Sequence, residues 1–300
     1  MLSTRFGVEI EFTGITRTEA AQAAAEYLHG TLENAGTYYD AKTITAQDGR
    51  VWKFMSDGSI HAEKKNGKRK EAINDSAYRV ELVTPILTYR EDIETLQGLV
   101  RVLRKKGGFA NNSCGIHIHL DGANHTPRSI RNFVNIIASK NDLFYKALAI
   151  EQERMRYCKK MDAYLVEKMN HAKPKTFRSI EEIWYAGYGE ARRQHYHSSR
   201  YHFLNLHSFF NGHHTVELRG FNSTLHAGEI RSYIVLALAL NHQALTQTCA
   251  SAKKPQIENE KFAMRTYLCR LGLNGDEFAA CREHLTKHLD GNAAWRFRAA

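Results

Sequence analysis

Short segments that alternate apolar and ionisable residues with a period of two constrain this chain most strongly. The first, Phe6–Phe12, reads FGVEIEF. Because successive side chains of a β-strand point to opposite faces, it predicts a strand with Glu9 and Glu11 on one face and apolar residues on the other. Two neighbouring carboxylates on a half-buried strand are costly unless cations neutralise them.

The same pattern recurs at 78–84, 115–120 and 215–220, each a predicted strand rather than a helix. Taken singly, each polar pair also fits a solvent-facing edge strand or a satisfied core histidine. Their shared placement favours a common site with two metal ions, and mostly carboxylate ligands with one imidazole favour Mg²⁺ or Mn²⁺. The polar residues of these segments are Glu81, His117, His119, Glu217 and Arg219.

The remaining segments predict helices and loops around these strands. Helices are expected at 16–29, 90–106, from 127 to about 168 with breaks, and at 228–249, 260–271 and 276–289. Further strands are expected at 50–55 and at 201–210, the latter joined to 215–220 by the turn Asn211-Gly212. A polar, basic loop is expected at 64–75.

These predictions give an α+β fold: one catalytic domain over 1–300 with an antiparallel sheet flanked by helices. Residues 170–200, rich in Arg, His, Tyr and Gly, are interpreted as a lid over the site or a disordered insert. Residues 226–300 form a helical C-terminal part. The histidines at 195–214 are irregularly spaced and are interpreted as loop residues rather than a second metal site.

Composition indicates the cellular location and the charge of possible partners rather than the reaction. The five cysteines are scattered and never form a C-x-x-C pair, which favours a reducing compartment and a cytoplasmic location. The longest apolar run, 230–240, is shorter than a bilayer span, so no membrane partner is expected. A formal charge of +10 favours polyanionic partners without ranking nucleotide, acidic metabolite and nucleic acid.

Five motifs, taken in order, resemble the amidoligase family, which belongs with glutamine synthetase and glutamate–cysteine ligase. The resemblance extends from Phe6 to Leu240, apart from 170–199. It implies a glutamine-synthetase-like antiparallel sheet and an ATP-dependent carboxylate–amine ligase. The motifs are FGVEIEF, SDGSI, ELVTPIL, NNSCGIHIHL and TVELRGFNSTL.

The resemblance also implies roles for single residues. His119 resembles an imidazole that contacts ATP phosphates, and Arg219 an arginine that neutralises the transferred phosphoryl group. Asp57 resembles the aspartate that receives the amine. Arg200, helped by Asn205, resembles an arginine near the carboxylate substrate. The residues that resemble metal ligands are Glu9, Glu11, Glu81, His117 and Glu217.

One departure leaves the number of metal ions open. Glutamine synthetases have a further carboxylate ligand several residues past the equivalent of Glu81, whereas residues 85–90 here contain none. The implied reaction joins a glutamate-like or peptide carboxylate to an amine through an acyl phosphate, with release of ADP and phosphate. The substrates and the oligomeric state stay open.

Two other classes of function also stay open. A metal-dependent hydrolase would use the same carboxylates and histidines to activate water without nucleotide. A nucleic-acid-binding protein would use the basic runs and the aromatic-rich segment 185–207, and would not need Glu9 or Glu11. Nucleic acid is compatible with the ligase hypothesis but is not required by it.

Overall fold

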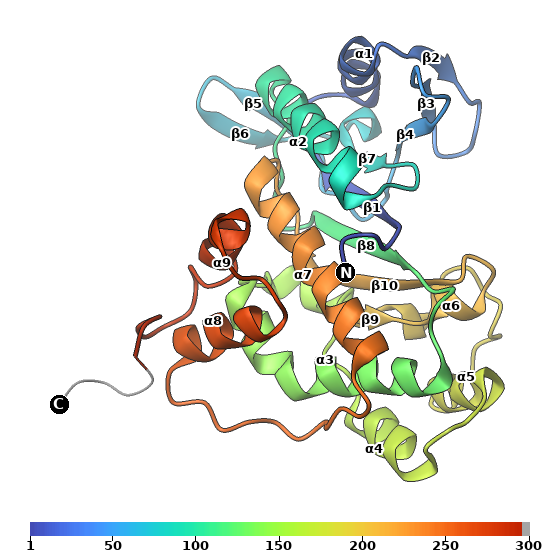
Figure 1. The fold of residues 1–300 in the computed structure, drawn as a ribbon. Coiled ribbons are helices and arrows are strands. Elements are labelled where there is room, and N and C mark those ends of the chain that lie inside the picture. The colour runs from blue at the N-terminus through green and yellow to red at the C-terminus, as the bar shows by residue number, and fades with distance from the viewer. Residues whose placement is uncertain (296–300) are drawn as a thin grey trace.

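The computed structural model describes residues 1–295 and is organised around an eight-stranded sheet with helices against it (Figure 1). The strand order is β2-β3-β4-β7-β1-β8-β10-β9, and all neighbours pair antiparallel. The strands are β1 (Phe6–Phe12), β2 (Thr31–Asn34), β3 (Lys42–Thr45), β4 (Val51–Met55), β7 (Val80–Val83), β8 (Gly115–Asp121), β9 (Leu204–Asn205) and β10 (Thr215–Asn222).

Helices contribute most of the remaining regular structure, and the predicted mixed α and β fold with a large antiparallel sheet is confirmed. The helices are α1 (Arg17–Leu28), α2 (Tyr89–Lys106), α3 (Pro127–Ala147), α4 (Ala163–Ala172), α5 (Phe177–Tyr185), α6 (His207–Phe210), α7 (Ala227–Thr246), α8 (Glu260–Arg270) and α9 (Ala279–His284). Short 3₁₀ turns lie at Ser76–Tyr78, Gln152–Arg156, Ser198–Arg200 and Asp276–Phe278.

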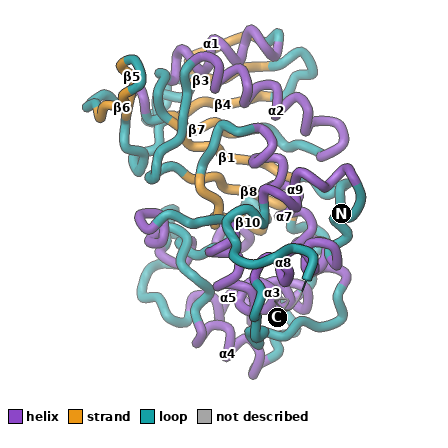
Figure 2. Tube along the Cα trace, turned by 90° about the vertical axis from the view of Figure 1, so that its left-hand side faces the viewer, coloured by secondary structure: helices purple, strands orange, loops and turns teal. Residues whose placement is uncertain are grey.

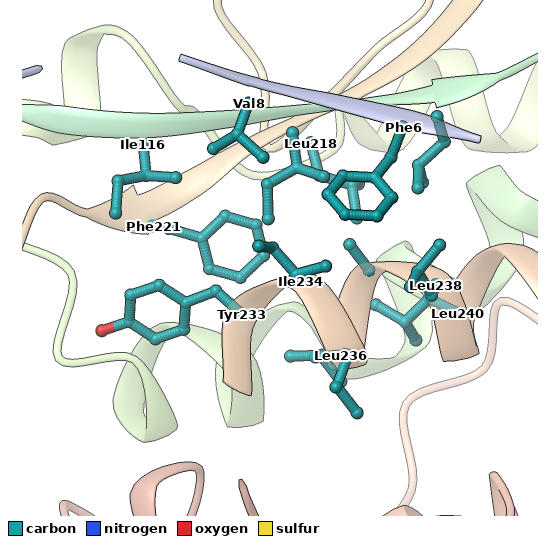
Figure 3. Packing of buried hydrophobic residues seen from close by; sticks show 14 of the residues in the cluster. Phe6, Val8, Ile116, Leu218, Phe221, Tyr233, Ile234, Leu236, Leu238 and Leu240 are labelled. Atoms are coloured by element: carbon teal, nitrogen blue, oxygen red, sulfur yellow. The ribbon is translucent and has the colours of Figure 1, made fainter. Parts of the chain in front are cut away.

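The apolar face of the sheet packs against helices. Figure 2 shows α1 and α2 beside the β3, β4 and β7 end of the sheet, and α7 lies against β8. In Figure 3, Val8 and Leu218 of the sheet point toward Ile234 of α7, and all three side chains are almost completely buried. This contact explains why α7 is apolar around most of its circumference: it lies between the sheet and α3, α2 and α9.

Local signals set several helix ends as predicted. Thr126 caps α3 by accepting a hydrogen bond from the Ser129 backbone N–H, with Pro127 at the first helical position. Gly107 ends α2 at a φ of 115°, a left-handed conformation that favours glycine. Within residues 1–295, no helix is both long and apolar enough to cross a membrane.

The predicted loop at 64–75 is wrong. The chain forms a separate two-stranded hairpin there, β5 (Glu63–Asn66) and β6 (Arg69–Ala72), turning at Gly67 with a φ of 60°. The segment has almost no apolar residues, so its strands show no apolar alternation, and the signal that favours a hairpin is Gly67 at the first position of the two-residue turn Gly67-Lys68.

The strand predicted at 201–210 is also wrong. Only β9, two residues long, is a strand there, and α6 follows it. The helical region predicted from 127 has the expected breaks: α3 ends at Ala147 and helix resumes as α4. Residues 170–200, interpreted as a lid or a disordered insert, contain α5, which buries Trp184 and Tyr185.

The C-terminal part is helical over α7, α8 and the short α9, and residues 296–300 of it lie outside the described residues. A helix over 276–289 is predicted, but the α-helix there spans only six residues after a 3₁₀ turn. The lid role of 170–200 and the single-domain assignment stay predictions.

Candidate active site

Four adjacent strands, β7, β1, β8 and β10, bring the predicted polar residues together on the face opposite α7. The antiparallel register places Glu9 opposite His117, and Glu217 opposite His119. Glu11 lies opposite Glu81 on the other side of β1. Residues more than 200 positions apart in the chain therefore meet because of strand order and register.

Two groups of possible ligands share one imidazole. Glu9, His117 and Glu217 form one group, and Glu11, Glu81 and His117 form the other, each with ligand atoms within 4.8 Å of one another. Glu9 Oε2 lies 2.9 Å from His117 Nδ1, and Glu11 Oε1 lies 3.8 Å from His117 Nε2. His117 thus stands between two carboxylate clusters and faces each with a different ring nitrogen.

Burial and repulsion make one of these clusters electrostatically unfavourable. Burial, and then the charge of Asp57, raise the pKa of Glu11 to about 7, even though the Gly115 backbone N–H donates to its Oε2 at 2.5 Å. Burial, and then the charges of Glu9 and Glu11, raise the pKa of Glu81 well above its ordinary value. A cation would relieve this repulsion, so the group fits a divalent metal ion.

The histidines differ in charge although they are two residues apart. Burial, aided by the nearby Arg219, lowers the pKa of His117 to about 4, which leaves the ring neutral, as a metal ligand must be. Burial would also lower the pKa of His119, but Glu9 and Glu217 outweigh it and raise that pKa to about 9. His119 is therefore a cation at neutral pH.

Glu9 and Glu217 are ionised because cationic side chains lie beside them. Burial opposes ionisation of Glu9, but the charge of His119 and a hydrogen bond from His117 hold its pKa well below the ordinary value. Arg219 and His119 likewise overcome burial and lower the pKa of Glu217 to about 2. His119 Nε2 lies 3.2 Å from Glu9 Oε1 but lacks hydrogen-bonding alignment, so it is available to another acceptor.

Arg219 is almost fully buried and donates to Glu217 through Nη1. The second oxygen of Glu217 accepts from Asn205 Nδ2 at 2.6 Å. Glu217 and Arg219 share one face of β10, since they contact each other and both line the cavity, although the pairing with β8 shifts register between Leu218 and Phe221. Arg219 also lines the cavity beside the carboxylates, so its charge lies where an anionic ligand would bind.

These side chains open into a cavity of about 970 Å³. Asp57 lies in its wall, at the turn after β4, and its Oδ1 accepts from the Ser59 backbone N–H at 2.6 Å. Every predicted site residue lines this cavity, including Asp57, Arg200 and Asn205, which come from outside the four central strands.

The segment after α5 forms another wall of the cavity. Arg193, His195, Tyr196 and Arg200 all line it, and Arg200 has a buried Nε without a hydrogen-bond partner among residues 1–295. The Tyr196 hydroxyl lies 2.8 Å from the Tyr39 hydroxyl, which comes from the connection between β2 and β3. This contact joins two sides of the cavity rim.

Arg154 is a cavity residue that the sequence does not predict. Only 2% of it is exposed, and it donates to the backbone carbonyls of Arg219, at 3.0 Å, and Phe221. Any side chain at position 115 would collide with its guanidinium, since an added Cβ would lie 2.2 Å from Nη2. The sequence signal for this contact was Gly115 beside the H-x-H motif, but no local pattern indicates that Gly115 contacts Arg154.

The histidines at 195–214 do not form a separate metal-binding group within residues 1–295. His197 is fully buried and stacks on His207, which accepts or donates a hydrogen bond with the Tyr185 hydroxyl at 2.7 Å. A third possible ligand group lies elsewhere, at His226, Glu229 and His284, but there Glu229 already pairs with Lys287.

Comparison with known families agrees with this arrangement. Residues 2–241 match a family model described as "Putative amidoligase enzyme", and the chain therefore belongs to the amidoligase family. A comparison with curated proteins found no match. The family match covers all eight strands of the sheet and most of α7, so every residue discussed in the cavity lies within it.

Proposed function

We propose that this chain is an ATP-dependent carboxylate–amine ligase with a glutamine-synthetase-like sheet. One observation carries the proposal: two groups of metal-compatible ligands share His117 at the floor of a cavity that also contains buried arginines. Family membership supports a ligase, and this pairing of cation-binding and anion-binding groups supports phosphoryl transfer within it.

The donor set fits Mg²⁺ or Mn²⁺, held by Glu9, Glu217 and His117 on one side and by Glu11, Glu81 and His117 on the other. Four carboxylates and a neutral imidazole are hard, oxygen-rich ligands, and the raised pKa values of Glu11 and Glu81 report carboxylates crowded without a cation. When bound, such ions would neutralise the negative charge of nucleotide phosphates.

The cations of the chain would act on the transferred group. His119, cationic at neutral pH, and Arg219 lie on the same face as the carboxylates and would bind phosphate oxygens. Arg200, with its unpartnered Nε, would hold the substrate carboxylate on the opposite wall. The carboxylate oxygen would then attack the γ-phosphorus of ATP and form an acyl phosphate with release of ADP.

Amide formation would use Asp57. The turn at 57–59 presents this carboxylate to the cavity while only Oδ1 is committed to the Ser59 backbone. An ammonium group bound there would lose a proton and attack the acyl carbon, and phosphate would leave. Exclusion of water matters because hydrolysis of the acyl phosphate would waste ATP, and the rim contact between Tyr39 and Tyr196 supports a closing role for residues 170–200.

Calorimetric titration of ATP tests the nucleotide step first. With Mg²⁺ present, wild type is expected to bind ATP, and Glu11→Gln to bind at least tenfold more weakly because one metal ligand is neutralised. Glu26→Gln is the matched control, since it makes the same chemical change on the surface of α1. Absence of ATP binding to wild type would reject the ligase and promote a metal-dependent hydrolase.

Trapping the intermediate tests the carboxylate step. Hydroxylamine converts an acyl phosphate into a stable hydroxamate, so incubation with ATP, Mg²⁺ and a panel of carboxylates that includes glutamate and γ-glutamyl peptides is expected to give ATP-dependent hydroxamate. Phosphate release without hydroxamate from any carboxylate would show a nucleotide hydrolase instead.

A further inference from the structure

The β5–β6 hairpin carries cations that the proposed reaction does not use. Its central residues, 64–70, read KKNGKRK, and all seven are exposed. We call Glu63–Ala72 the basic arm. None of its residues lines the cavity, although its base lies only six residues after Asp57.

A second basic run joins the arm from a distant part of the chain. The last turn of α2 ends in the exposed residues Arg104, Lys105 and Lys106. Phe109, three residues later, packs against the arm, with Lys65 Nζ and Lys70 Nζ 5.2 Å and 4.5 Å from its ring centroid. Figure 1 shows the hairpin beside α2. Eight cations, five from 64–70 and three from 104–106, thus share one corner of the molecule.

These charges are only partly balanced locally, because Glu71 lies opposite Lys64 in the hairpin and Glu63 lies at its base. None of the eight forms an ion pair with another group of residues 1–295. Lys65 and Lys70 are direct cross-strand partners, an arrangement in which like charges destabilise a hairpin. The Phe109 ring offsets part of this repulsion, and an anionic partner would relieve the rest.

The arm is held firmly at its base. Glu63 exchanges hydrogen bonds with Thr13, whose hydroxyl donates to the Glu63 carbonyl at 2.9 Å and accepts from the Glu63 N–H at 2.8 Å. The Gly14 N–H donates to the same carbonyl at 3.0 Å. The end of β1 therefore fixes the arm, so little ordering would be needed when it binds a partner.

The shape and composition of the arm select among polyanions. A two-stranded ribbon fits the major groove of B-form DNA, where phosphates line both walls. The large exposed hydrophobic residues of 1–295 all lie outside the arm, so it offers neither apolar anchors for a lipid bilayer nor aromatic rings on which unpaired bases would stack. Specific binding of an acidic peptide would need a groove. The residues that line the two described cavities do not include any residue of the arm.

We propose that the basic arm and the end of α2 bind the phosphate backbone of double-stranded DNA without reading its sequence. The interaction is independent of the proposed ligase site, because it uses none of the cavity residues. Electrostatic binding of this kind releases counterions, so its affinity falls steeply with salt.

Fluorescence anisotropy of the full chain with a labelled random-sequence DNA duplex tests this. The arm variant replaces Lys64, Lys68 and Arg69 by Gln and spares the lysines that pack on Phe109. The control variant replaces three exposed cations elsewhere, Arg128, Lys175 and Lys253, by Gln and changes the net charge equally. Thermal unfolding of both variants checks that the fold is retained.

The arm variant is expected to bind at least about a hundredfold more weakly at low salt, with a salt dependence reduced by about three units of slope, while the control changes by less than about threefold. Glu11→Gln is expected to bind duplex like wild type, which separates this result from failure of the ligase proposal. Equal loss in the two triple variants, tighter binding of anionic vesicles or polyglutamate than of duplex, or no duplex binding at low salt would each overturn the proposal.

Discussion

The two faces of the central sheet come from the same strands and differ in almost every physical property. On one face, Val8, Ile10 and Ile118 are almost completely buried within the hydrophobic cluster that includes α7. On the other, Glu11 and His117 are nearly as buried, yet they sit among charges at the floor of a cavity. Burial is similar, so burial alone does not distinguish core from candidate site.

The difference lies in what burial does to free energy on each face. Removing the apolar side chains from water stabilises the fold by about 25 cal/mol per Å² of buried surface. Removing carboxylates from water costs free energy, which appears as the raised pKa values of Glu11 and Glu81. The apolar face therefore stabilises the fold that holds the charged face together, and the predictions that follow exploit this contrast.

The largest effect is expected when a charge is placed on the apolar face. Ile118→Glu would bury an unpaired carboxylate between the sheet and its helices, and we expect a loss of about 4 kcal/mol or more in the free energy of unfolding. Ile118→Val, which only removes a methylene, is expected to cost about 1 kcal/mol. Urea denaturation measures both, and similar losses would contradict the contrast between the faces.

The reverse change on the charged face is expected to stabilise the metal-free protein. Burial and Asp57 raise the pKa of Glu11 to about 7, so its ionised form opposes folding at pH 8. Glu11→Gln, measured in chelator at pH 8, should raise the free energy of unfolding by about 2 kcal/mol. Glu26→Gln on the surface should change it by less than about 0.5 kcal/mol. Destabilisation by Glu11→Gln would mean that its ionised form is favourably held without metal.

A smaller effect is expected from pH alone. Glu11, with a pKa raised to about 7, stabilises the fold below its unfolded pKa and loses this contribution as pH rises through 7. His119, with a pKa raised to about 9, does the same between its unfolded pKa and 9. In chelator, unfolding free energy should therefore fall by about 1 to 2 kcal/mol from pH 6.5 to pH 8.

Saturating Mg²⁺ or Mn²⁺ should shrink this fall, since cations replace the protons on the carboxylates. Thermal unfolding at the two pH values, with and without metal, measures both effects. A protein whose stability is unchanged over this range, or that responds identically with metal, would show that these groups are ordinary surface residues in solution.

The charged face can be predicted from sequence because alternation is a local signal. β1 and β8 alternate strictly, so the pattern alone places Glu9 and Glu11 on one face of β1, and His117 and His119 on one face of β8. What brings the strands together is their order, with β1 between β7 and β8. The family resemblance, rather than the periodicity, implies that the polar residues of these strands form one site.

Other features have no local signal. Arg154 contacts Gly115 and the carbonyls of β10, and nothing in the sequence around it indicates these partners. The β5–β6 hairpin alternates charged with charged residues, so it shows no apolar periodicity. Trp184 and Tyr185 lie in a segment rich in polar residues, and their burial depends on tertiary packing that composition does not report.

The position of β1 has a consequence for how the chain acquires its structure during synthesis. It leaves the ribosome before every other strand of this sheet, yet its two neighbours in the sheet begin only at residues 80 and 115. A nascent chain therefore presents an apolar strand with both edges unpaired for a considerable time, a form that chaperones recognise. Glu217 and Arg219 arrive still later, so a ribosome paused before β10 holds a chain with its core begun and its chemistry incomplete.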